Sequence, residues 1–328
     1  MILGSPLSWL LTELVALVLF FVVMAHAVRQ EDPVCRVLEL FAFIVSAAIF
    51  ENIGVGFAHA YSYDLRRVMM IGAVPLEILL LEAVIWYAAF NLTARLGLPR
   101  WAQPFVVGLL GSVQDLTIDP PAVFDRYALT DPAQIAKWNA LYPGSMGNGA
   151  LSGQWNWTNP GYDNLLFGIP FYNFSGWLTL MGYFTVFVLL GRWLSRKSGS
   201  KSFSYILPFI GSILTVVAIV SPLNRLFLFA YPFALRGDRT AEMVMLCINY
   251  AFPLALLALF RNRHIKGDLK RDGLVVFGIP ILLHSFDIVY AFALGTRIAY
   301  LPVLAVSAVH IAYLAFLFRA FSSGPFQR

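Results

Sequence analysis

Apolar runs long enough to cross a membrane recur along almost the whole chain. A helix that crosses the hydrocarbon core of a bilayer needs about 17–25 consecutive, mainly apolar residues. Backbone polar groups cannot face lipid unpaired, so such runs fold as helices, and they are too long for barrel strands. The sequence therefore predicts an all-α fold, a polytopic transmembrane helix bundle of about nine spans. The predicted spans are residues 7–28, 37–59, 68–90, 102–118, 168–191, 203–223, 241–260, 273–293 and 297–319.

The composition agrees with a membrane location. Hydrophobic residues make up 59% of the chain and charged residues only 12%, whereas soluble domains carry about 25% charged residues. Basic clusters such as "RKSGSK" lie between the apolar runs, so the positive net charge indicates membrane topology and contact with anionic lipids, not nucleic-acid binding. Cys35 and Cys247 lie far apart without a CxxC motif, which excludes a disulfide framework and a cysteine-based metal centre.

We find no internal repeat and no second domain, so residues 1–328 are predicted to form one integral membrane domain. Lys and Arg gather on one side of the predicted spans, which places the N-terminus outside and the C-terminus in the cytoplasm. No Lys or Arg precedes Arg29, so the first span is expected to be a retained helix and not a cleaved signal peptide. The apolar segment 224–235 is too short to cross and is expected to be re-entrant or interfacial.

The longest connection, residues 119–167, is predicted to be a non-cytoplasmic loop insertion. It is rich in Pro, Gly, Asn and Ser, which predicts turns and one short helix at 132–140. Its Trp and Tyr content argues against disorder. A connection of this length is usually functional, so the loop is a candidate part of a binding site.

Two carboxyls in an apolar span are the first catalytic candidates, because ionisable residues inside a membrane are costly and usually functional. Asp115 and Asp119 in "QDLTIDPP" are four positions apart, so on a helix they share one face. Burial of two such close carboxyls favours a retained proton, and a protonated carboxyl can act as a general acid. The structural alternative is a pair at a helix end, with Asp119 opening an Asp-Pro turn.

Three further polar residues lie in or beside apolar spans. Glu51, in "FENIGVG", adjoins a glycine-rich helix end where the backbone can approach a ligand. The alternative for Glu51 is a polar contact between helices. His284 and Asp287, in "LLHSFDIVY", are three positions apart on one helix face, and they either bind a ligand or form a pair that locks the helix into the bundle. Three carboxylates close to predicted span ends are assigned to the membrane border: Glu13, Glu39 and Glu242.

Large rings and amides are unusually dense in "GQWNWTNPGYDNLLFGIPFYNFSGW". A simple connection needs turn-forming residues, not rings of this size. The stretch therefore predicts the wall of a hydrophobic binding slot, although single rings also suit an aromatic belt at the membrane interface. The predicted wall residues are Trp155, Trp157, Tyr172, Asn173, Phe174 and Trp177.

The motifs "QDLTIDP", "GQWNW" and "GYDNLLFGIPFYNFSGW", with the earlier "ENIGVGFAHAYSYD" and "GAVPLEILL", resemble a family of membrane carotenoid-biosynthesis enzymes. This family contains the CruF-type carotenoid 1,2-hydratases and the bisanhydrobacterioruberin hydratases. The resemblance covers roughly residues 50–180. The segment "VGFAHAYSY" lacks the proline and the second glycine of the family pattern.

The resemblance implies acid-catalysed addition of water across the terminal C1=C2 double bond of an acyclic carotenoid, in the cytoplasmic membrane of a bacterium or archaeon. Asp115 or Asp119 would protonate C2, while the second carboxylate, Asn173 or Glu51 would handle the water. Aromatic faces would stabilise the cation, by about 0.5–2 kcal/mol each when desolvated. No redox change occurs, so neither a cofactor nor a metal is expected.

Two other functions fit parts of the same pattern. A non-catalytic carotenoid- or lipid-binding subunit, associated with other membrane proteins, would carry the same aromatic wall. A membrane prenyltransferase would hold Mg²⁺ and a diphosphate with acidic motifs, for which Asp115-x-x-x-Asp119 and Asp238-x-x-x-Glu242 are the candidates. Its first acidic motif would, however, be expected earlier in the chain.

Overall fold

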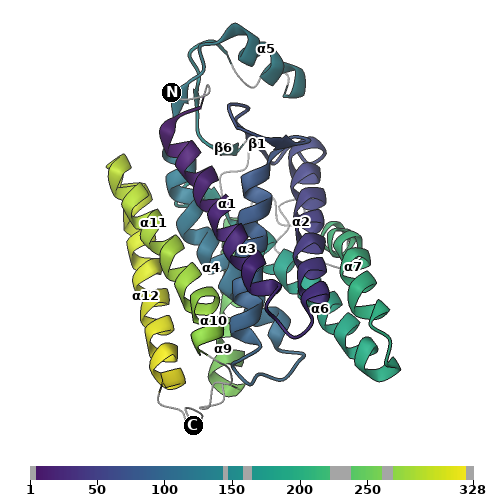
Figure 1. Ribbon diagram of the computed structural model, residues 1–328. Coiled ribbons are helices and arrows are strands. Elements are labelled where there is room, and N and C mark those ends of the chain that lie inside the picture. The colour runs from purple at the N-terminus through teal and green to yellow at the C-terminus, as the bar shows by residue number, and fades with distance from the viewer. Residues whose placement is uncertain (1–4, 143–146, 158–164, 222–237, 261–268, 323–328) are drawn as a thin grey trace.

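Long helices lie side by side and form one bundle in the computed structural model (Figure 1). The structure describes residues 5–142, 147–157, 165–221, 238–260 and 269–322. The predicted re-entrant segment 224–235 lies outside these residues. The helices are α1 (Leu7–Ala27), α2 (Pro33–Gly56), α3 (Leu76–Thr93), α4 (Gln103–Phe124), α5 (Pro132–Leu141), α6 (Phe171–Ser198), α7 (Ser202–Val220), α9 (Arg239–Phe260), α10 (Leu269–Gly273), the π-helical η2 (Leu274–Gly278), α11 (Ile279–Leu294) and α12 (Arg297–Ser322).

Eight helical segments of the described chain are long and apolar enough to span a membrane. They are α1, α2, α3, α6, α7, α9, α12 and the segment Arg271–Leu294 that joins α10, η2 and α11. This confirms the prediction of an all-α transmembrane bundle. The remaining predicted span, residues 102–118, corresponds to α4, which has 22 residues but carries Gln114, Asp115 and Asp119. α4 is surrounded by α3, α6, α9, α11 and α12, so its polar side chains are shielded from lipid.

Two predicted helix boundaries differ from the structure. The span predicted at 68–90 begins only at Leu76, because residues 61–75 are largely extended. The span predicted at 102–118 continues to Phe124 through Pro120 and Pro121. Proline has no N–H, so these two positions remove intrahelical hydrogen bonds. Surrounding helices keep the segment helical, and Asp119 therefore lies inside a helix and does not open a turn.

The connection between α4 and α6 consequently begins after Phe124 and not at residue 119. Its predicted short helix is confirmed as α5, whose first turn is capped by Asp131: the carboxylate accepts a hydrogen bond from the Ala133 N–H at 2.9 Å. α5 lies beyond the end of the bundle at which α1 begins, whereas α12 ends at the opposite end (Figure 1).

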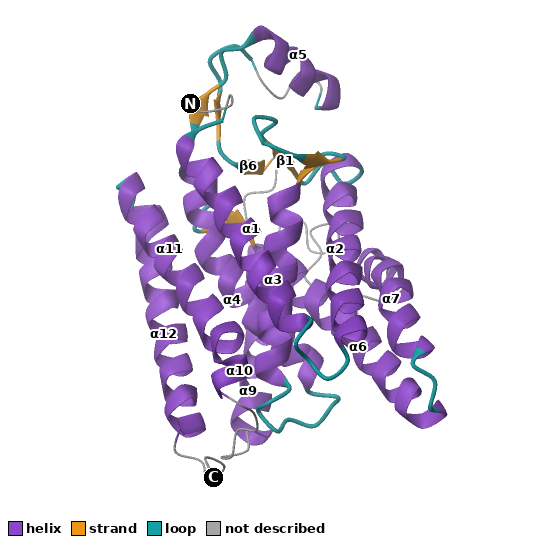
Figure 2. Cartoon of the chain, viewed as in Figure 1, coloured by secondary structure: helices purple, strands orange, loops and turns teal. Residues whose placement is uncertain are grey.

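Short antiparallel strand pairs, which the sequence did not predict, cover the same end of the bundle (Figure 2). β1 (Tyr61–Tyr63) pairs with β6 (Trp155–Trp157), so that Tyr61 faces Trp157 and Tyr63 faces Trp155. This pairing joins the segment after α2 to the aromatic stretch. The remaining pairs are β2 (Met70–Ile71) with β3 (Val74–Pro75), β4 (Tyr127–Ala128) with β5 (Leu151–Ser152), and β7 (Leu165–Leu166) with β8 (Ile169–Pro170).

Glycines bring α4 and α6 into unusually close contact. A Cβ atom at Gly108 would lie 2.3 Å from the carbonyl oxygen of Leu178, and one at Gly111 would lie 1.9 Å from the Met181 sulfur. Small residues allow this approach between membrane helices. One turn further along, the Ser112 hydroxyl donates to the carbonyl of Phe174 at 3.0 Å. These contacts set the register of α4 against the first turn of α6.

We predict that Gly108→Ala destabilises the bundle. Alanine favours a helix over glycine by about 1 kcal/mol, but the added methyl group would collide with rigid backbone, and overpacking costs about 1–3 kcal/mol. Thermal unfolding in detergent measures the change. Gly56→Ala is the control, because Gly56 is exposed and its Cβ would have no neighbour within 4 Å. Equal unfolding temperatures for the two variants would show that the α4–α6 contact is not tight.

Candidate functional site

Four buried carboxyls from three helices form one cluster inside the bundle. Glu51 comes from α2, Glu82 from α3, and Asp115 and Asp119 from α4. None of the four residues is more than 5% exposed. Glu82 lies close to Glu51, and Asp115 lies close to Asp119. Two carboxylates buried side by side repel each other, so a proton retained on one partner of each pair lowers this repulsion.

Neutral donors from the surrounding segments hold the cluster in place. The hydroxyls of Tyr61 and Tyr63 donate to the same oxygen of Glu51, Oε2, at 2.8 and 2.5 Å. The side-chain amide of Asn173 donates to Asp115 Oδ2 at 2.8 Å and to Asp119 Oδ2 at 2.7 Å. One amide thus bridges both aspartates and fixes their separation.

Several other carboxyl oxygens of the cluster have no hydrogen-bond donor in the part of the chain that the structure describes. Both carboxyl oxygens of Glu82, and Oδ1 of Asp115, have no hydrogen-bond donor among the described residues. A buried polar atom without a partner is costly, by about 1–3 kcal/mol. The two Glu82 oxygens, whose residue lines the cavity described below, are therefore available to a proton or to water.

The strand conformation of β1 explains how two tyrosines reach one glutamate. Residues two apart on a strand point to the same face, and both phenols of the Tyr61–Ser62–Tyr63 strand point at Glu51. Burial, followed by the nearby Glu51 carboxylate, raises the pKa of Tyr61 and Tyr63 well above the ordinary value. Both phenols therefore stay protonated at neutral pH and keep donating.

A cavity of about 30 Å³ opens beside the carboxyls. Its wall carries Trp155, Trp157 and Trp177, and no basic residue is among the described residues that line it. A water molecule needs about 10–15 Å³ measured in this way, so the cavity has room for one or two waters. The other lining residues are Glu51, Tyr61, Tyr63, Ile78, Leu81, Glu82, Ile118, Asp119 and Asn173.

The structure brings together most of the residues predicted from the sequence. Six of them line the cavity: Glu51, Asp119, Trp155, Trp157, Asn173 and Trp177. Asp115 lies behind Asp119 and shares the Asn173 amide with it. The ring of Tyr172 packs edge-on against Trp157 with a centroid distance of 5.8 Å, so it supports the wall without lining it. Phe174 is fully buried in the helical core and does not line the predicted slot.

His284 and Asp287 belong to a different cluster, between α4, α11 and α12. Asp287 accepts a hydrogen bond from the Thr117 hydroxyl at 2.8 Å, and His284 Nε2 lies 2.7 Å from His310 Nδ1. Thr117 is on another face of α4 than Asp115 and Asp119. The two residues predicted to bind substrate therefore do not line the aromatic cavity and instead tie α11 and α12 to α4.

Three polar residues of the cavity were not among the predicted site residues: Glu82, Tyr61 and Tyr63. Glu82 interrupts a long apolar run, which by itself marks a functional candidate. The alternation in "YSY" is the signal for two rings on one strand face. Neither signal indicates which partner the residue meets, because the partners lie on other elements of the fold.

Comparison of the chain with protein-family models, with curated proteins and with solved structures found no match. The site is therefore interpreted from its own chemistry. Within the described residues, no group of three or more His, Cys, Asp or Glu side chains is arranged to hold a metal ion. Asp238, half of the second acidic motif, is exposed and caps α9 by accepting from the Ala241 N–H at 2.8 Å.

We predict that Tyr63→Phe lowers the free energy of unfolding by about 1–3 kcal/mol, because it removes a donor from a buried carboxyl. Denaturant or thermal unfolding in detergent measures the loss. The matched control is Tyr205→Phe, since the Tyr205 hydroxyl lies 3.5 Å from Asp32 in a half-buried position. Equal losses of unfolding free energy in the two variants would show that the hydrogen bond from Tyr63 to Glu51 stabilises the fold no more than the contact of Tyr205 does.

Proposed function

We propose that this protein adds water across the terminal C1=C2 double bond of an acyclic carotenoid or similar polyene. The observation that carries the proposal is the joint placement of paired carboxyls and three indole rings around one cavity inside a membrane bundle. Hydration of an alkene needs an acid, a base for water and a surface that tolerates a carbocation. The residues of this cavity can supply all three.

Asp119 is the proposed acid because it lines the cavity, while Asp115 lies behind it and shares its hydrogen-bond donor. The O–H proton of Asp119 adds to C2, the π bond breaks, and a tertiary cation forms at C1. Three indole rings, Trp155, Trp157 and Trp177, line the cavity, and an aromatic face presented to a desolvated cation is worth about 0.5–2 kcal/mol. A basic residue at this position would oppose the cation.

The Glu51–Glu82 pair, which also lines the cavity, is the proposed base. Water attacks C1 through its oxygen, and its surplus proton passes to this pair, so that a tertiary alcohol remains. One proton leaves the aspartate pair and one enters the glutamate pair, which restores the overall proton count. No electrons are gained or lost, so the reaction is complete without a redox cofactor. Tyr61 and Tyr63 orient Glu51 for this step.

The size of the cavity favours a second candidate function. About 30 Å³ accommodates water but not the end of a polyene, so substrate entry requires displacement of the half-buried Trp157 and Trp177. If these rings instead hold a pigment or lipid at the surface of the cavity, the protein is a non-catalytic carotenoid- or lipid-binding subunit. The same experiment separates the two functions.

We predict that Asp119→Asn abolishes hydration. Removal of a general acid lowers the rate by about 10²–10⁴-fold, whereas the neutral amide preserves size and hydrogen bonding. Expression in a host that accumulates lycopene, followed by mass spectrometry, should show a gain of one water for the unmodified chain. The control is Asp131→Asn, because Asp131 is the exposed N-cap of α5 and asparagine caps equally well.

Two results would change the interpretation. Equal product from the Asp119→Asn and unmodified proteins would place the acid elsewhere. Absence of product, together with pigment that co-purifies with the unmodified protein and is lost on replacement of Trp157 by Leu, would favour the binding subunit.

Isotope labelling gives an independent prediction. In D₂O the product should carry one carbon-bound deuterium at C2, because the transferred proton comes from a carboxyl that exchanges with solvent. In H₂¹⁸O the new hydroxyl should contain ¹⁸O. Oxygen derived from O₂ would instead indicate an oxidative hydroxylation and would contradict the proposed mechanism, whichever residue acts as the acid.

A further inference from the structure

A second polar cavity lies at the opposite end of the bundle, where α1, α3 and α6 end and α2 and α7 begin (Figure 1). Its volume is about 330 Å³, many times the 10–15 Å³ or so that a water requires. Five arginines from four parts of the chain line it: Arg36, Arg95, Arg192, Arg196 and Arg271. Such convergence of basic residues from separate helices is not explained by the proposed hydration reaction.

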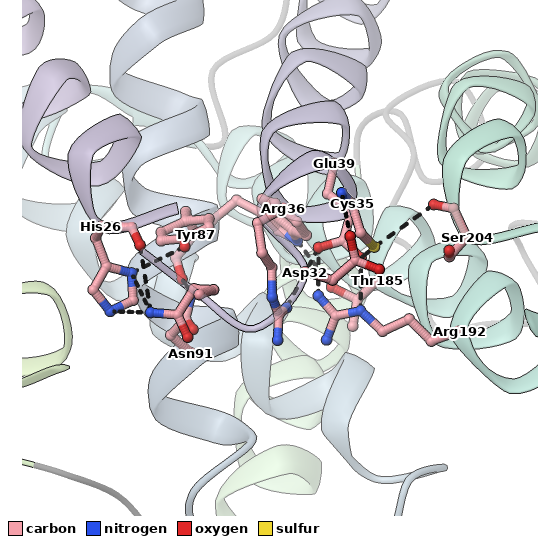
Figure 3. A network of polar contacts seen from close by, with 12 residues as sticks. His26, Asp32, Cys35, Arg36, Glu39, Tyr87, Asn91, Thr185, Arg192 and Ser204 are labelled. Carbon is pink, nitrogen blue, oxygen red and sulfur yellow. Dashed lines mark hydrogen bonds and ion pairs between the residues drawn. The ribbon is translucent and has the colours of Figure 1, made fainter. Parts of the chain in front are cut away.

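Two of these arginines share one buried carboxylate, that of Glu39 (Figure 3). The guanidinium of Arg192 binds both oxygens of Glu39, with its Nε donating to Oε1 at 2.6 Å. It also lies 4.6 Å from the centre of the Phe90 ring. Arg36 donates to Glu39 Oε2 at 3.4 Å. Glu39 is thus buried near an end of the bundle, where its carboxylate orients two cations.

A second carboxylate, that of Asp272, plays the same role for two other arginines of the lining. Asp272 accepts from Arg95 Nε at 3.2 Å and from Arg271 Nε at 3.0 Å. His26 Nε2 lies 3.0 Å from the same carboxylate. Both carboxylates are only 1% exposed, so the guanidiniums are anchored from inside the protein while the cavity stays open to their remaining N–H groups.

The balance of charge favours an anion in the cavity. Glu39 binds two guanidiniums, and Asp272 binds two others. Each carboxylate neutralises one positive charge, so one positive charge remains at each of the two carboxylates. The exposed Arg196 forms no ion pair with the described residues and adds a further positive charge. Asp32, which also lines the cavity, is paired with Lys201 at 3.4 Å, which leaves Glu31 as the one unpaired acidic residue among the described lining.

We propose that this cavity binds a phosphate group, carried either by the headgroup of an anionic phospholipid or by a soluble phosphate compound. The planar guanidinium presents paired N–H donors that match the oxygens of a phosphate. Basic pockets between membrane helices are suited to phospholipid headgroups. Ser204, whose carbonyl oxygen accepts from the Cys35 thiol (Figure 3), is also part of the lining.

Two binding measurements on the full chain test the proposal and distinguish the sources. Calorimetry with inorganic pyrophosphate, on protein in a neutral detergent, probes a soluble phosphate compound. Native mass spectrometry after reconstitution in vesicles of phosphatidylcholine, with and without phosphatidylglycerol, probes a lipid headgroup. Arg36→Gln and Arg196→Gln should each weaken binding by about tenfold or more, the loss of one charge-assisted hydrogen bond.

Lys197→Gln is the matched control, because Lys197 is the exposed neighbour of Arg196, packs on Trp193 at 5.1 Å and does not line the cavity. Arg196→Gln breaks no ion pair among the described residues, so loss of folding does not explain a loss of binding by this variant. Binding of pyrophosphate supports the soluble source, and retention of phosphatidylglycerol alone supports the lipid source. Binding of neither, or equal weakening by Lys197→Gln and Arg196→Gln, would overturn the proposal.

Discussion

The geometry of the candidate site depends on one amide, that of Asn173, which donates to both Asp115 and Asp119. In a bundle that excludes water, a carboxyl oxygen without a donor is costly. Asn173 reaches both aspartates because it lies in the first turn of α6, and Gly108 and Gly111 let α4 approach that helix closely. The position of the acidic pair is therefore a consequence of helix packing that small residues permit.

The strand pairing of β1 with β6 adds the other half of the site. It places Tyr61 and Tyr63 against Glu51, and Trp155 and Trp157 at the cavity wall. A two-stranded pair is marginally stable alone, and here the rings of both strands pack edge-to-face, with a centroid distance of 5.1 Å between Tyr61 and Trp157. Aromatic packing and carboxyl hydrogen bonds thus stabilise the same few residues, which couples the shape of the wall to the position of Glu51.

The spacing of apolar and acidic residues along short stretches of the sequence predicted the helical bundle and part of the site. Both depend on residues that are close together in the chain. The four-residue spacing of Asp115 and Asp119 was sufficient to place them on one face. The pairing of residues 61–63 with residues 155–157 joins distant segments, so no local pattern indicates it. The continuation of α4 through Pro120 was also missed, since tertiary packing overrides the usual effect of proline in a helix. The ion pair between Glu39 and Arg192 was likewise not predicted, because Arg192 lies on α6, far from Glu39 in the sequence.

The central helix α4 explains why the two clusters of titratable residues stay separate. One face carries Asp115 and Asp119 toward the aromatic cavity, and another carries Gln114 and Thr117 toward His284. A helix that is polar on two faces cannot meet lipid, which accounts for its enclosure by five other helices. The arginine cavity lies apart, at the end of the bundle where α12 ends. The arginines at this end contrast with the aromatic cavity, whose described lining carries no basic residue.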